Sequence, residues 1–165
     1  MDKSNQACIH FLNYSRDFLI AAEMVHNKSN EIPLPLPTYF LYGRSIELSL
    51  KAYLLTCGYT IDVLRKKEFG HNLKALFNEA INKNISEIIE IDNFEEGALE
   101  VLNFSYKDKQ YEYHPDRPNS GTGCYYHLPH IEVVEQLARK LVAGLDENFN
   151  KSDDTDCENN LFHRP

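Results

Sequence analysis

One segment of the sequence, residues 39–55, is apolar around most of a helical circumference. A helix of this kind has almost no face for water, so other elements must cover it on several sides. Residues 38–56 are therefore predicted to form the central helix of an all-α bundle. Glu47 and Lys51 stand four residues apart in the order that favours an ion pair, so one narrow face stays polar. Gly58 is well placed to end the helix through a left-handed turn.

Other segments have the periodicity of amphipathic helices that cover a central one. They are residues 6–27, a short piece at 61–67, and the segments 73–81, 93–104 and 131–145. Asn72 is suited to cap one of them, and Asp92 with Glu95 has the capping-box arrangement. The sequence thus predicts an all-α, up-and-down bundle of about five helices.

Two segments break this pattern. Residues 105–129 are rich in tyrosine, proline, glycine and histidine, and they predict a long loop before the last helix. Such loops are uncommon in small domains and are often functional. The acidic residues 149–165 are predicted to be a disordered tail, which leaves residues 1–148 as one helical domain.

The formal net charge of −8 argues against broad attraction to nucleic acid phosphates, although it permits a local basic patch. The charge is segregated, because acidic residues gather at 87–100 and in the tail, whereas residues 65–67 are basic. No segment is long and apolar enough for a membrane span, and the first residues lack a secretory signal. We therefore expect a cytoplasmic protein that does not associate with a membrane.

The string from Ile46 to Leu55, followed by Gly58 and by Gly70-His71-Asn72-Leu73, resembles the HEPN domain family. That family has an "E-x-x-L-K-A-x-L" central helix, a glycine, and a "GH-D/N-L" turn into the next helix. The tyrosine-rich loop before a final amphipathic helix adds to the resemblance. The resemblance implies a helical bundle that forms a homodimer and takes part in toxin–antitoxin, phage-defence or RNA-processing systems.

Many HEPN-like domains are metal-independent ribonucleases with an Arg-polar-x-x-x-His type motif near the start of the last helix. Residues 131–145 carry no arginine followed by histidine at that spacing. The only arginine-to-histidine spacing in the family's range runs from Arg65 to His71, on a different element and with lysine in the second position.

Arg65 and His71 are the candidate catalytic residues. Cleavage of RNA through the 2′-hydroxyl needs a base that titrates near neutrality and a cation for the developing phosphorane charge. Lys66 and Lys67 are candidates for steering phosphate towards them. The structural alternative is that His71 packs and caps the turn while the basic run is a solvated helix end.

A second candidate site lies in the loop, where Tyr111, Tyr113, His114 and Arg117 combine aromatic rings with cations. Such residues stack on bases and bind phosphate in single-stranded nucleic acids. The alternative is that the tyrosines fasten the loop to the bundle.

Cys124, His127 and His130 offer sulfur and imidazole, which suit zinc, but their spacing matches no common zinc module and no fourth ligand is evident. We predict no metal and no cofactor. The two hypotheses for function are an HEPN-like ribonuclease and a non-catalytic interaction module. The module binds a nucleotide or a protein partner, such as a nucleotidyltransferase-like protein.

Overall fold

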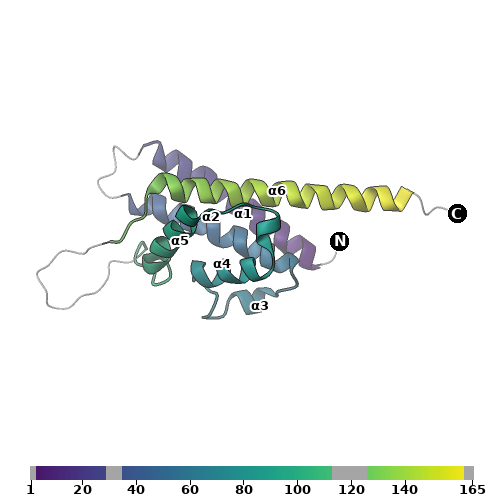
Figure 1. Ribbon diagram of the computed structural model, residues 1–165, viewed down its shortest axis with the longest axis horizontal. Coiled ribbons are helices and arrows are strands. Elements are labelled where there is room, and N and C mark those ends of the chain that lie inside the picture. The colour runs from purple at the N-terminus through teal and green to yellow at the C-terminus, as the bar shows by residue number, and fades with distance from the viewer. Residues whose placement is uncertain (1–2, 29–34, 113–125, 162–165) are drawn as a thin grey trace, which may run out of the picture.

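The computed structural model describes residues 3–28, 35–112 and 126–161 of the 165-residue chain. The described residues form helices and connections without a β-strand, so the predicted all-α fold is confirmed (Figure 1). In chain order the elements are α1 (Lys3–His26), α2 (Leu36–Thr56), α3 (Ile61–Leu64), α4 (Leu73–Asn82), the 3₁₀ helix η2 (Ile85–Glu87), α5 (Asn93–Tyr106) and α6 (Ile131–Leu161).

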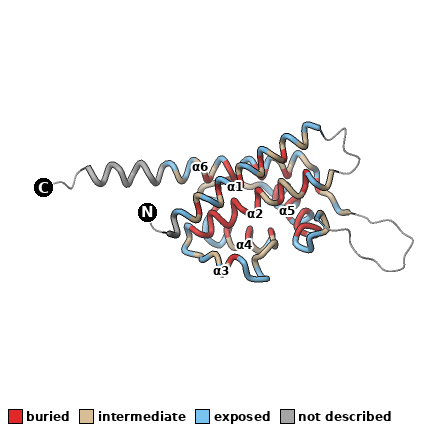
Figure 2. Tube along the Cα trace, turned by 180° about the vertical axis from the view of Figure 1, so that it is seen from behind, coloured by how far each residue is buried: buried red, intermediate tan, exposed pale blue. Residues whose placement is uncertain are grey.

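Helix α2 occupies the centre of the bundle, as its sequence predicts. It packs against α1, α4, α5 and α6, and Tyr42, Ile46, Leu50 and Leu54 on it have no exposed surface. Figure 2 shows that buried residues run along almost its whole length. The charged positions Glu47 and Lys51 are buried as well, so the narrow polar face is enclosed by neighbouring elements.

The predicted end of α2 and the predicted starts of α4 and α5 are confirmed. Gly58 follows α2 with φ of +88°, a left-handed conformation that side chains disfavour. The Asn72 side chain accepts a hydrogen bond from the Ala75 backbone N–H and caps α4. Asp92 and Glu95 form the predicted capping box at the start of α5.

The last helix is longer than its periodicity predicts. The apolar pattern ends near Leu145, whereas α6 runs to Leu161. The extra turn next to the bundle has its own contacts, because Asp146 pairs with Arg16 on α1 and Phe149 packs against the core. None of the described helices is long and apolar enough to cross a membrane.

Buried serines line the contact between α1 and α2. The Ser15 hydroxyl donates to the carbonyl oxygen of Ser45 at 3.0 Å, and the Ser45 hydroxyl donates to the carbonyl oxygen of Ser15 at 2.9 Å. The Ser49 hydroxyl shares a third hydrogen bond with Ser15, and none of the three residues has exposed surface. Small side chains with satisfied hydroxyls let the two helices approach closely.

Candidate functional site

The site is built around Glu47, a carboxylate on α2 that has no exposed surface. Its Oε1 accepts hydrogen bonds from Lys51 Nζ at 2.6 Å and from an Arg44 guanidinium nitrogen at 2.9 Å. Its Oε2 lies 2.7 Å from the Tyr106 hydroxyl on α5 and 3.1 Å from His71 Nδ1. Four side chains from three parts of the fold therefore meet at one carboxylate.

Glu47 is ionised despite its burial. Burial has the largest influence on its pKa and by itself would raise it. The hydrogen bond from His71 and the charges of Lys51 and Arg44 act in the opposite direction and outweigh burial, so the pKa is lowered from 4.5 to about 2. Burial and the negative charge of Glu47 both raise the pKa of the Tyr106 hydroxyl, which therefore stays protonated and donates.

Local sequence explains how these side chains reach Glu47. Arg44, Glu47 and Lys51 are three and four residues apart and so share one face of α2. Lys51 Nζ also donates to the carbonyl oxygen of Gly70 at 2.6 Å, which attaches the turn before α4 to the central helix. That attachment brings His71 beside Glu47.

Tyr106 reaches Glu47 because Gly43 lets its ring lie directly on α2. A Cβ atom at position 43 would stand 2.7 Å from two carbons of the Tyr106 ring. The ring is also in edge contact with the imidazole of His71, with centroids 6.2 Å apart.

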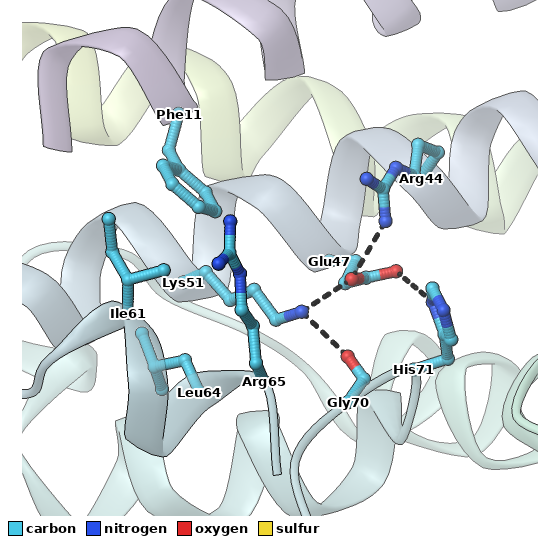
Figure 3. Close-up of a pocket in the computed structure, with 9 residues that line it drawn as sticks. All are labelled: Phe11, Arg44, Glu47, Lys51, Ile61, Leu64, Arg65, Gly70 and His71. Atoms are coloured by element: carbon cyan, nitrogen blue, oxygen red, sulfur yellow. Dashed lines mark hydrogen bonds and ion pairs between the residues drawn. The ribbon is translucent and has the colours of Figure 1, made fainter. Parts of the chain in front are cut away.

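Glu47 and three of its neighbours, Arg44, Lys51 and His71, border a pocket of about 230 Å³, which we name the Glu47 pocket (Figure 3). Its lining residues are Phe11, Arg44, Glu47, Lys51, Ile61, Leu64, Arg65, Gly70 and His71. Three cationic side chains and one carboxylate line it, so two positive charges are left without a carboxylate in the pocket. This local excess contrasts with the net charge of −8.

Arg65 and His71, the predicted catalytic residues, both line this pocket. Arg65 follows the last turn of α3, is exposed, and its side chain makes no ion pair, hydrogen bond or ring contact within the described part of the chain. In Figure 3 it stands across the pocket from His71.

The bond to Glu47 sets the tautomer of His71. An ionised carboxylate only accepts hydrogen bonds, so Nδ1 carries the proton, and in the neutral ring Nε2 then has a free lone pair. The His71 side chain is 38% exposed, which leaves part of the imidazole open to a ligand. The arrangement can therefore accept a proton at Nε2 and hold the resulting imidazolium on Glu47.

The other predicted site residues lie elsewhere. Lys66 and Lys67 are exposed in the turn after α3 and do not line the Glu47 pocket. The ring of Tyr111 lies between Tyr39 and Tyr126, with centroid distances of 6.2 and 6.5 Å, and its hydroxyl is buried. This placement favours the packing interpretation of Tyr111.

Tyr113, His114, Arg117 and Cys124 lie outside the described residues. Among the residues that are described, no group of three or more histidine, cysteine, aspartate or glutamate side chains is arranged to hold a metal ion. His127 packs edge-on against Phe104, and His130 pairs with Glu132.

Sequence reasoning did not identify Phe11, Arg44, Glu47 and Tyr106 as parts of a site. The sequence did contain a signal for Arg44 and Glu47. Within an apolar helix, three charged residues are spaced by three and four positions, as Arg44-x-x-Glu47-x-x-x-Lys51. Phe11 and Tyr106 arrive from other helices through tertiary packing, and periodicity gives no information about such contacts.

Comparison with known proteins gives no relative for this chain: no family model, curated protein or solved structure matches it. The HEPN resemblance therefore rests on the sequence: the central helix, the turn that contains His71, and the tyrosine-rich loop before the last helix.

Proposed function

We propose that this protein is an HEPN-like, metal-independent ribonuclease and that the Glu47 pocket binds the phosphodiester that is cleaved. One observation carries the proposal: a histidine held on a buried, ionised carboxylate lines the same pocket as an arginine that has no partner among the described residues. A base fixed in one tautomer and a free cation suffice for transfer of a phosphoryl group to a neighbouring hydroxyl.

Each residue has a role in the proposed reaction. His71 Nε2 accepts the proton of the ribose 2′-hydroxyl, and the 2′-oxygen attacks phosphorus. The 5′-oxygen leaves and takes a proton from water, and the hydroxide that remains takes the proton from the His71 imidazolium. The products are a 2′,3′-cyclic phosphate and a 5′-hydroxyl. Arg65 stabilises the charge on the phosphorane oxygens, and Glu47 positions His71 and stabilises its imidazolium form.

The test compares cleavage of single-stranded RNA by the wild type and by His71→Asn, with metal chelator present. Asparagine does not titrate in this range, so we expect the rate to fall roughly 100- to 10,000-fold. His130→Asn is the matched control, because His130 pairs with Glu132 on the surface and does not line the pocket. Wild-type products should end in a cyclic phosphate, and DNA should remain intact. Equal rates for the wild type and His71→Asn would refute the proposal.

The second candidate is a non-catalytic interaction module that binds a nucleotide or a protein partner. The observation that favours it is that Arg44, Lys51 and His71 all contact Glu47, which gives each of them a structural role without catalysis. Nucleotide binding without cleavage of any RNA would favour this candidate. For either function we propose a homodimer, and light scattering on the purified protein measures its mass directly.

A further inference from the structure

A second hollow lies beside the Glu47 pocket and shares Ile61 and Arg65 with it. Its volume is about 420 Å³, and its other lining residues are Ala7, Leu55, Tyr59, Thr60 and Asp62. We name it the Tyr59 pocket. Arg65 borders both pockets, so a ligand bound at its guanidinium lies beside each of them.

The two pockets differ in charge. The Glu47 pocket has three cations and one carboxylate, whereas the Tyr59 pocket has one cation, Arg65, and one carboxylate, Asp62, among mostly apolar residues. A phosphate is stabilised by the first environment. A nucleobase, which is flat, uncharged and polar only at its edge, suits the second.

Tyr59 offers that base a surface in a fixed position. Its ring meets Phe69 edge-on at a centroid distance of 6.1 Å, and Lys83 Nζ lies 5.8 Å from the ring centroid. Its hydroxyl donates to the Glu79 carboxylate. A ring held on three sides is ordered before a base arrives, which favours stacking.

Building on the proposed function, we propose that the substrate is single-stranded RNA bound over at least two nucleotides. The phosphodiester lies at Arg65 and the Glu47 pocket, and one flanking base enters the Tyr59 pocket, where Asp62 selects guanine. Guanine presents two adjacent N–H donors on its Watson–Crick edge, which match the two oxygens of a carboxylate. Adenine and cytosine present one amino group there, and uracil presents one N–H between two acceptors.

The test measures dissociation constants for 2′-fluoro dinucleotides, which lack the attacking hydroxyl and so report binding without cleavage. Guanosine and uridine give two such dinucleotides, GpU and UpG. We expect one of the two to bind at least about ten-fold more tightly than 5′-guanosine monophosphate. Replacing guanine by hypoxanthine removes one donor and should weaken binding about five-fold or more.

Two variants that each remove one negative charge test whether Asp62 is the residue that selects guanine. Asp62→Asn should abolish the difference between guanine and hypoxanthine. Glu68→Gln should keep it, because Glu68 is exposed near the same basic run and lines neither pocket.

The outcomes separate this inference from the proposed function. Equal affinity for mononucleotide and dinucleotide, or an unchanged preference for guanine in Asp62→Asn, would overturn the inference and leave cleavage by His71 standing. Absence of binding to every nucleotide would overturn both.

Discussion

Helix α2 buries two sets of polar side chains, and they differ in chemistry and in what surrounds them. Towards α1 it presents Ser45 and Ser49, whose hydroxyls form a closed set of hydrogen bonds with Ser15. Towards the connection between α3 and α4 it presents Arg44, Glu47 and Lys51, which border a pocket. The serine set fills its space, whereas the charged set leaves space beside it.

We interpret this difference as the one between polar groups that serve packing and polar groups that serve the binding we propose. Buried charges are costly, and a well-packed apolar replacement of similar volume is often as stable. The serine contact needs only small residues, so its composition is explained by helix packing alone. The Glu47 set has an excess cation and an open side, and packing alone does not require either feature.

The largest effect is expected from Glu47→Gln, which removes the charge and keeps the shape. Lys51 and Arg44 then lose their buried counter-charge, and the free energy of unfolding should fall by roughly 3–5 kcal/mol. Urea denaturation at neutral pH measures this change. Glu100→Gln is the control, because its pair with Lys74 is about half exposed and should contribute no more than about 1 kcal/mol. A loss for Glu47→Gln as small as that of the control would show that Lys51 and Arg44 do not depend on the charge of Glu47.

Acid should remove the same contribution from the wild type. The pKa of Glu47 is about 2 in the folded protein and 4.5 in the unfolded chain. The unfolded chain therefore takes up the proton first as pH falls. The stabilisation is complete above pH 4.5 and is lost between pH 4.5 and 2. At 1.36 kcal/mol for each pKa unit it amounts to about 3 kcal/mol.

The measurement is the difference in unfolding free energy between the wild type and Glu47→Gln at several pH values in this range. Carboxylates common to both proteins cancel in the difference. The difference should shrink as pH falls, and a constant difference from pH 6 to 2.5 would show that Glu47 is not ionised in the folded state.

The sequence was a good guide to the helices because their causes are local. The apolar circumference of residues 39–55 predicts the central helix, and the capping residues Asn72 and Asp92 fix where α4 and α5 begin. The apolar pattern underestimates the length of α6. Asp146 and Phe149 contact the bundle just beyond that pattern, and such tertiary contacts leave no periodic signal.

The candidate site was only partly predictable from the sequence. Arg65 and His71 follow from their residue types and spacing, and the structure brings them to one pocket. The burial of Glu47 depends on the Tyr106 ring that lies over Gly43 and on the bond from Lys51 to Gly70, and both contacts join segments far apart in the sequence. Helical periodicity alone predicts only an ion pair between Glu47 and Lys51.

The smallest effect is expected from Ser49→Ala, on the opposite side of α2. It removes one buried hydroxyl and leaves Ser15 with its bonds to Ser45, so the free energy of unfolding should fall by about 1 kcal/mol. Affinity for the 2′-fluoro dinucleotides should not change, because Ser49 lines neither pocket. Calorimetry on the same samples gives both values. Arg65→Gln removes the cation that we place at the phosphodiester and is the reference for a loss of affinity. A comparable loss in Ser49→Ala would mean that both sides of α2 serve binding, and the contrast between them would no longer hold.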